Sequence, residues 1–68
     1  MRAWYTCKSG LRADLCLLLN RASTRLIIRN QAGDTSSSEV YPSWNAAISA
    51  MLETGESWTS DMTGLPLV

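Results

Sequence analysis

The stretch LCLLLNRASTRLIIRN, residues 15–30, constrains the fold most strongly because it holds two short apolar runs separated by polar residues. Neither run approaches the roughly 20 apolar residues that a helix needs to cross a bilayer. From residue 11 to residue 20, apolar side chains occupy every odd position, and Ile27 and Ile28 have branched side chains; both features favour strands. A helix over residues 11–20 is the alternative, because Leu and Ala are good helix formers and Ser9 is a suitable N-cap.

The two runs predict an antiparallel hairpin, with strands over residues 11–20 and 24–30. If residues 21–24 make the connection, Asn20 pairs with Arg25. This register pairs apolar side chains with apolar side chains on the face that we expect to be buried, called the dry face below. A slip of one residue would destroy the match. The predicted pairs are Leu19 with Leu26, Leu17 with Ile28, Leu18 with Ile27, and Cys16 with Arg29.

A first strand is predicted over residues 3–8, with Ser9 and Gly10 as the turn that leads into the second strand. With those two residues as the loop, Trp4 joins the leucine-rich face. Tyr5 then lies on the opposite, outer face, together with the arginines of the hairpin. The sequence therefore predicts a sheet with one dry face and one basic face.

The best-specified helix spans residues 43–54, in the segment PSWNAAISAMLETG. Ser43 is the predicted N-cap and Gly55 the residue that ends the helix. The apolar residues of this segment recur at helical spacing and form a single stripe: Trp44, Ala47, Ile48, Met51 and Leu52. We expect the stripe to pack on the dry face of the sheet, and a partner-binding amphipathic helix is the alternative. Residues 38–41 are candidates for a short fourth strand.

The predicted fold is α+β: a three- to four-stranded antiparallel meander with one amphipathic helix packed on one face, in a single small domain over residues 1–68. Residues 56–68 are too apolar for a free tail, and we expect them to fold back onto the sheet. Their predicted target is a patch of Cys16, Leu18 and Ile27 on the outer face, which would otherwise meet water. A second copy of the chain would hide the same patch.

The formal net charge is zero, but the charges are unevenly distributed along the chain. All six basic residues precede residue 30, where Asp14 is the one acidic residue, so residues 1–29 carry +5. The other five acidic residues give residues 30–68 a charge of −5. Such asymmetry indicates either contact with a polyanion or attraction between the two halves of the fold, and composition does not choose between them.

The chain lacks the residues that several classes of function require. The chain has no histidine and no Gly-rich phosphate loop, and its carboxylates are not spaced as an acid–base pair, so we expect no enzyme, no catalytic residue and no cofactor. Two cysteines without histidine favour neither a disulfide framework nor a metal site. No membrane-spanning run or signal peptide is evident. We expect a cytoplasmic protein with no membrane partner and no small-molecule substrate.

Nucleic-acid binding is one hypothesis, because cations around an aromatic side chain suit contact with phosphates and bases. The candidate contacts are Tyr5, Arg12, Arg21, Arg25 and Arg29. In element order over residues 3–54, a three-stranded sheet followed by YPSWNAAISAML resembles the small domains of AP2-type factors and of some integrase arm-binding domains. Those domains place strands in the major groove, which implies a contact role for Arg12, Arg25 and Arg29. Asp14 and the zero net charge depart from the usual basic character of such domains.

The interpretation that the sequence favours is a small accessory or protein-interaction domain, of a kind common in bacteria and phages. Its arginines would then be solvated strand residues that protect the sheet against aggregation. A protein partner or a second copy in a homodimer would cover the apolar patch of Cys16, Leu18 and Ile27. Nucleic acid is the alternative partner.

Overall fold

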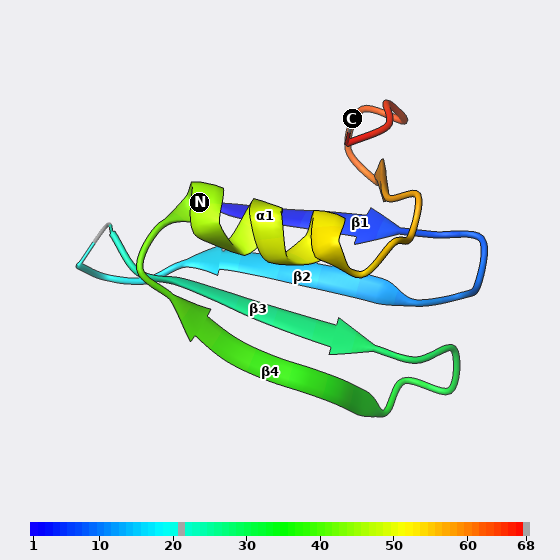
Figure 1. Ribbon diagram of the computed structural model, residues 1–68, viewed down its shortest axis with the longest axis horizontal. Helices are drawn as coiled ribbons and strands as arrows, with labels where there is room; N and C mark the ends of the chain where they lie inside the picture. The colour runs from blue at the N-terminus through cyan, green and yellow to red at the C-terminus, as the bar shows by residue number, and fades with distance from the viewer. Residues whose placement is uncertain (21, 68) are drawn as a thin grey trace.

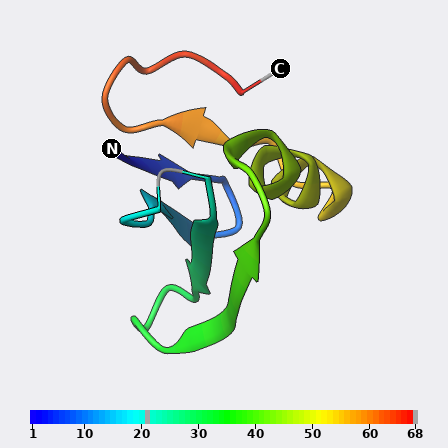
Figure 2. The same cartoon turned by 90° about the vertical axis from the view of Figure 1, so that its left-hand side faces the viewer.

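In the computed structural model, which describes residues 1–20 and 22–67, the chain forms an antiparallel sheet and a helix. The elements in chain order are β1 (Arg2–Thr6), β2 (Arg12–Leu17), β3 (Thr24–Arg29), β4 (Thr35–Tyr41), α1 (Trp44–Glu53) and β5 (Thr59–Ser60). Their order in the sheet is β4-β3-β2-β1-β5, and α1 runs along one face (Figure 1). Figure 2 shows the helix on one side of the curved sheet. The predicted α+β meander is confirmed, with β5 as an additional strand.

The β2–β3 hairpin has the predicted faces but a different register. Leu15 pairs with Leu26, a shift of four residues from the predicted register. The connection begins earlier than predicted, because the N–H of Leu18 donates to the carbonyl of Ser23 and the Asn20 side chain accepts two backbone N–H groups of the turn. Because the shift is an even number of residues, each side chain within the strands keeps its predicted face.

The β1–β2 hairpin departs from the predicted register by one residue. Its turn is longer than the predicted two residues: the N–H of Cys7 donates to the carbonyl of Leu11, and Gly10 adopts a positive φ of 89° that other residues rarely adopt. A shift of one residue reverses the direction of every side chain in the strand. Trp4 therefore lies on the outer face and Tyr5 on the helix face, and both predictions were wrong.

The second half of the chain contains the predicted helix and a longer fourth strand. β4 begins at Thr35 instead of residue 38. The Ser43 hydroxyl accepts a first-turn N–H at 3.1 Å, and Gly55 follows the last turn with a φ of 79°, so both predicted ends of the helix are confirmed. The apolar stripe packs against the core except for Leu52, which is exposed.

The core lies between α1 and the covered face of the sheet. Its buried apolar side chains come from β2, β3, α1 and the tail: Ala13, Leu15, Leu26, Ile28, Ala47, Met51 and Trp58. Trp58 is the largest of them, and its indole N–H donates to the carbonyl of Met51 at 3.0 Å. The only polar atom of this side chain is therefore satisfied inside the core.

The tail folds back, but not onto the outer face as predicted. β5 pairs with the edge of β1, and Pro66 forms a bridge with Thr59. This pairing places the tail beyond the β1 edge of the sheet (Figure 1). Leu67 packs against the core, whereas Met62 and Leu65 are exposed. The described part of the tail thus extends the sheet sideways and does not cover the predicted patch.

Candidate functional site

The outer face of the sheet, the side opposite α1, carries three of the arginines that the sequence analysis singled out. Cross-strand partners lie side by side, so the side chains of this face fall in three rows across β1, β2 and β3. The first row holds Thr6, Arg12 and Arg29, the second holds Trp4, Asp14 and Ile27, and the third holds Arg2, Cys16 and Arg25. Two basic rows therefore flank a middle row that presents an indole and an isoleucine.

Arg12 and Arg29 are direct cross-strand partners, so two positive charges lie opposite each other. Like charges in such positions repel and destabilise a sheet. Within residues 1–20 and 22–67, no carboxylate lies at ion-pair distance from either arginine or from Arg25. Strand pairing therefore holds three cations on one face, and none of them forms an ion pair with a carboxylate of the described residues.

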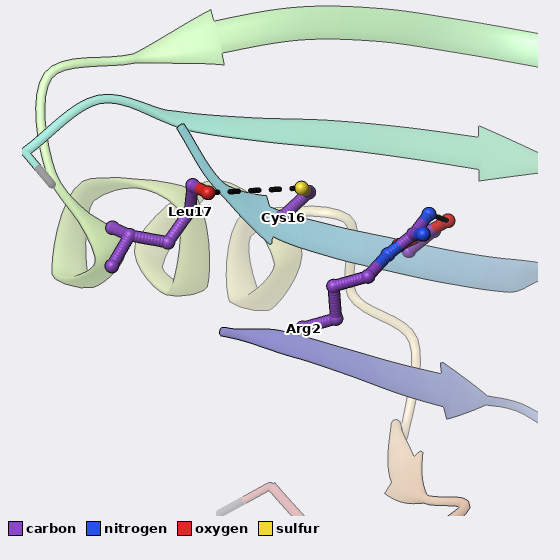
Figure 3. Close-up of polar contacts among 4 residues, drawn as sticks. Arg2, Cys16 and Leu17 are labelled. Carbon is purple, nitrogen blue, oxygen red and sulfur yellow. Dashed lines mark hydrogen bonds and ion pairs between the residues drawn. The ribbon is translucent and has the colours of Figure 1, made fainter. Parts of the chain in front are cut away.

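Asp14 is the carboxylate within these rows, and only 9% of its surface is exposed. Its Oδ2 accepts a hydrogen bond from Arg2 Nη2 at 2.9 Å, and the Arg2 side chain reaches from β1 toward β2 to make this contact (Figure 3). Its Oδ1 has no hydrogen-bond partner among the described residues. A buried acceptor without a donor lowers stability, so packing alone does not explain Asp14.

Trp4 stands in the middle row with 42% of its surface exposed. The Arg2 guanidinium lies 5.5 Å from the centre of the Trp4 ring, within cation–π distance. Beside the ring, the surface has a hollow with a volume of about 270 Å³. The residues that line it are Trp4, Tyr5, Arg12, Ala13, Asp14, Arg29 and Asp61. The hollow thus combines an aromatic wall with two arginines and two carboxylates.

Most acidic residues of the second half lie away from the outer face. Asp34 is in the β3–β4 turn, Glu39 is on the helix face of β4, Glu53 ends α1 and Glu56 follows it. Asp61 is the exception, because it adjoins β1 and its Oδ1 accepts the Thr6 hydroxyl at 3.3 Å. The ion pair found in the described part of the chain joins two residues of the first half. Direct ion pairing between the halves therefore does not neutralise the basic face there.

The structure brings three of the five predicted nucleic-acid contacts together. Arg12, Arg25 and Arg29 share the outer face, as predicted. Tyr5 does not: its side chain packs against the core on the helix face, because the β1–β2 register differs by one residue. Arg21 lies outside the described residues.

The sequence analysis missed Arg2 and Trp4, which the structure adds to the outer face. Alternation along β1 indicates that residues 2 and 4 share a face, and that Ala3 and Tyr5 share the other. It does not indicate which pair meets the core. The length of the turn after β1 decides this, and the residue types at the turn allow more than one length.

The predicted apolar patch is split between two places. Cys16 and Ile27 lie half-buried in the outer face, whereas Leu18 lies beyond the end of β2. The residues that line a second hollow there, of about 440 Å³, are Met1, Leu17, Leu18 and Leu19. Leu19 is fully exposed and does not join the dry face as predicted. The three predicted patch residues therefore do not form one continuous surface.

Within the described ranges, no three potential metal ligands come together. No described helix is long and apolar enough to cross a membrane. The chain matches no protein-family model, no curated protein and no solved structure.

Proposed function

We propose that this chain is a small binding domain that binds single-stranded nucleic acid on the outer face of its sheet. The observation that supports the proposal is the placement of three arginines, none of them in an ion pair with a described carboxylate, on both sides of the row that holds Trp4. Arginine guanidinium groups donate hydrogen bonds to phosphate oxygens, and an aromatic ring on an open sheet offers a stacking surface for a base. The outer face holds both kinds of group within one set of neighbouring strands.

The spacing of the basic rows suits an extended strand. Arg25 and Arg29 are four residues apart on β3, which corresponds to about 13 Å between the two rows. A nucleic-acid strand that crosses the sheet would have phosphates at both rows and bases over Trp4 and Ile27. Contacts of this kind hold the backbone and give affinity without reading sequence.

The width of the sheet favours a single strand over a duplex. The major groove of B-DNA is about 12 Å wide. The basic rows lie on β1, β2 and β3, but β4 and the two-residue β5 flank them, and five strands at a spacing of about 4.8 Å span roughly 19 Å, which is wider than the groove. The resemblance to AP2-type and integrase arm-binding domains covers one sheet and one helix, and β5 widens this sheet beyond the predicted three to four strands. We therefore propose a different mode of contact from theirs.

Fluorescence anisotropy with labelled, mixed-sequence single strands of DNA and RNA tests the proposal, with a DNA hairpin duplex as the comparison. We expect single strands to bind with a slope of log K against log salt near −2, as about three phosphate contacts give. Arg25→Glu should weaken binding about tenfold at about 50 mM salt, because it places a negative charge beside the phosphates. Lys8→Glu makes the same charge change in the exposed β1–β2 turn and is the matched control.

Lack of binding at about 50 mM salt would contradict the proposal, because electrostatic contacts are strongest at low salt. An equal loss in Lys8→Glu and Arg25→Glu would also contradict it, since the effect would then come from net charge and not from the outer face. Tighter binding to the duplex would contradict the choice of a single strand.

Protein binding is a second candidate function, favoured by the exposed apolar corner at the β2–β3 connection. Leu19 is fully exposed there, beside Met1 and Leu18. We propose a second copy of the chain as the partner, because a two-fold contact covers the same corner on both molecules. Sedimentation velocity should show concentration-dependent dimers that Leu19→Ser abolishes. A monomer at every concentration would contradict this candidate.

A further inference from the structure

We propose that the hollow beside Trp4 binds one nucleotide of the bound strand and prefers a base that carries an exocyclic amino group. This inference rests on the proposed function and deepens it, because it assigns a preference among bases to a face whose other contacts do not read sequence. The observation that carries it is the unequal chemistry of the hollow, which has two arginines in the first row and two carboxylates around Trp4.

The basic side of the hollow suits the phosphate. Arg12 and Arg29 are direct partners across β2 and β3, which places their Cβ atoms about 5 Å apart. No carboxylate of the described residues pairs with either side chain. A phosphate between the two guanidinium groups would accept hydrogen bonds from both and would remove the repulsion between them.

The wall and the size of the hollow suit one base. Trp4 presents 42% of its surface, and an aromatic ring stacks with any base because every base has a π face. The volume of about 270 Å³ is at the small end of ligand pockets. One nucleotide therefore occupies the hollow, and the rest of the strand continues over the neighbouring rows.

The acidic side of the hollow selects the base. Asp61 continues the middle row beyond β1, because its N–H donates to the carbonyl of Trp4 at 2.9 Å, so Trp4 lies between Asp61 and Asp14. The Asp14 Oδ1 has no described donor, so the negative charge of this group is only partly compensated and attracts donors to this side. Asp61 is exposed, and the Thr6 hydroxyl is the only described donor to its side chain.

An ionised carboxylate accepts hydrogen bonds and cannot donate them. Cytosine presents an N4 amino group at the position where thymine and uracil present a carbonyl oxygen. The amino group can donate to the Asp61 carboxylate, whereas the carbonyl oxygen would be repelled by it. Adenine also has an amino group at its Watson–Crick edge, and we expect it to behave like cytosine.

Strands of eight deoxycytidines and eight deoxyuridines test the inference, because they have equal charge and length and their bases differ at this position. We expect the cytidine strand to bind about tenfold more tightly at pH 7.5, as one hydrogen bond to a charged group gives. Asp61→Asn should reduce the preference to about twofold or less, because an amide can donate to the uracil carbonyl as well as accept. Asp34→Asn, in the exposed β3–β4 turn, makes the same chemical change and should keep the preference.

Asp14→Asn should weaken the preference too, but Asp14 is buried and bonded to Arg2, so circular dichroism must first confirm that this variant folds. The exposed Asp61 variant keeps the test decisive if the Asp14 variant does not fold. Equal salt-dependent binding of the two strands would overturn the base preference and leave the proposed function standing. Lack of binding by both strands would overturn both. If free cytidine monophosphate binds as tightly as the strand, the occupant is a free nucleotide and the strand subsite is overturned.

Discussion

The two faces of the sheet are built from alternate residues of the same strands, but their contacts differ in kind. On the helix face, Leu15 and Leu26 are paired, buried and packed with the helix. On the outer face, Arg12 lies opposite Arg29, and Asp14 has a buried oxygen without a described partner. Apart from the buried Thr24 hydroxyl, the helix face follows the rules of a stable core, whereas the outer face retains both opposed charges and a buried carboxylate oxygen that lower stability. Such local departures are characteristic of binding sites.

Two of the three tryptophans, Trp4 and Trp58, show the same contrast with one residue type. Trp58 is 2% exposed and donates its indole N–H within the core, whereas Trp4 is 42% exposed beside a hollow. If the contrast between the faces is correct, removing each indole should have a different consequence. Loss of Trp58 should affect folding, and loss of Trp4 should affect binding.

The largest expected effect is that of Trp58→Ala, which should lower the free energy of unfolding by about 3–5 kcal/mol. This is a large share of the stability of a small domain, so the variant will be partly or fully unfolded. Urea denaturation followed by circular dichroism measures the change, with Trp4→Ala as the matched control that should lose about 1 kcal/mol or less. Equal losses of unfolding free energy in the two variants would contradict the proposed difference between the faces.

Thr24 offers a smaller test, because it is a buried polar side chain on the otherwise apolar helix face. Its side chain is fully buried, and its Oγ1 has no described hydrogen-bond partner. Thr24→Val keeps the shape and removes the hydroxyl, so it should raise stability by about 1 kcal/mol. Thermal unfolding should show a Tm about 4–8 °C higher. An unchanged or lower Tm would show that the hydroxyl is satisfied in solution.

The smallest expected effect concerns the repulsion across β2 and β3. Arg12→Thr removes one of two opposed charges, so it should raise stability by roughly 0.2–0.5 kcal/mol at low salt. The gain should disappear near 1 M salt, where charges are screened. Arg25→Thr is the control, because Arg25 lies opposite Cys16 and has no arginine partner. A gain that does not depend on salt would show that strand propensity, and not repulsion, is its cause.

Alternation predicted the faces of β2 and β3 correctly, because Leu26 and Ile28 alternate with Arg25, Ile27 and Arg29 over a regular strand. It did not predict their register, which depends on how the Asn20 side chain closes the turn. The same limitation explains the reversed positions of Trp4 and Tyr5. β5 could not be predicted, because Thr59 and Ser60 have no strand pattern of their own and pair only where the edge of β1 is available.

By itself, the sequence determined the strand and helix periods, the capped ends of α1 and the common side of Arg12, Arg25 and Arg29. The periods and caps follow from residues that are close along the chain, and the common side of the arginines follows from matching the apolar faces of two neighbouring strands, which every even register preserves. Only the tertiary structure decided that Trp4 and Arg2 join the arginines, that Asp61 lies beside them and that the tail, as far as residue 67, leaves this surface uncovered. Those arrangements depend on turn geometry and on pairing between segments far apart in sequence, where a change of one residue reverses a whole strand.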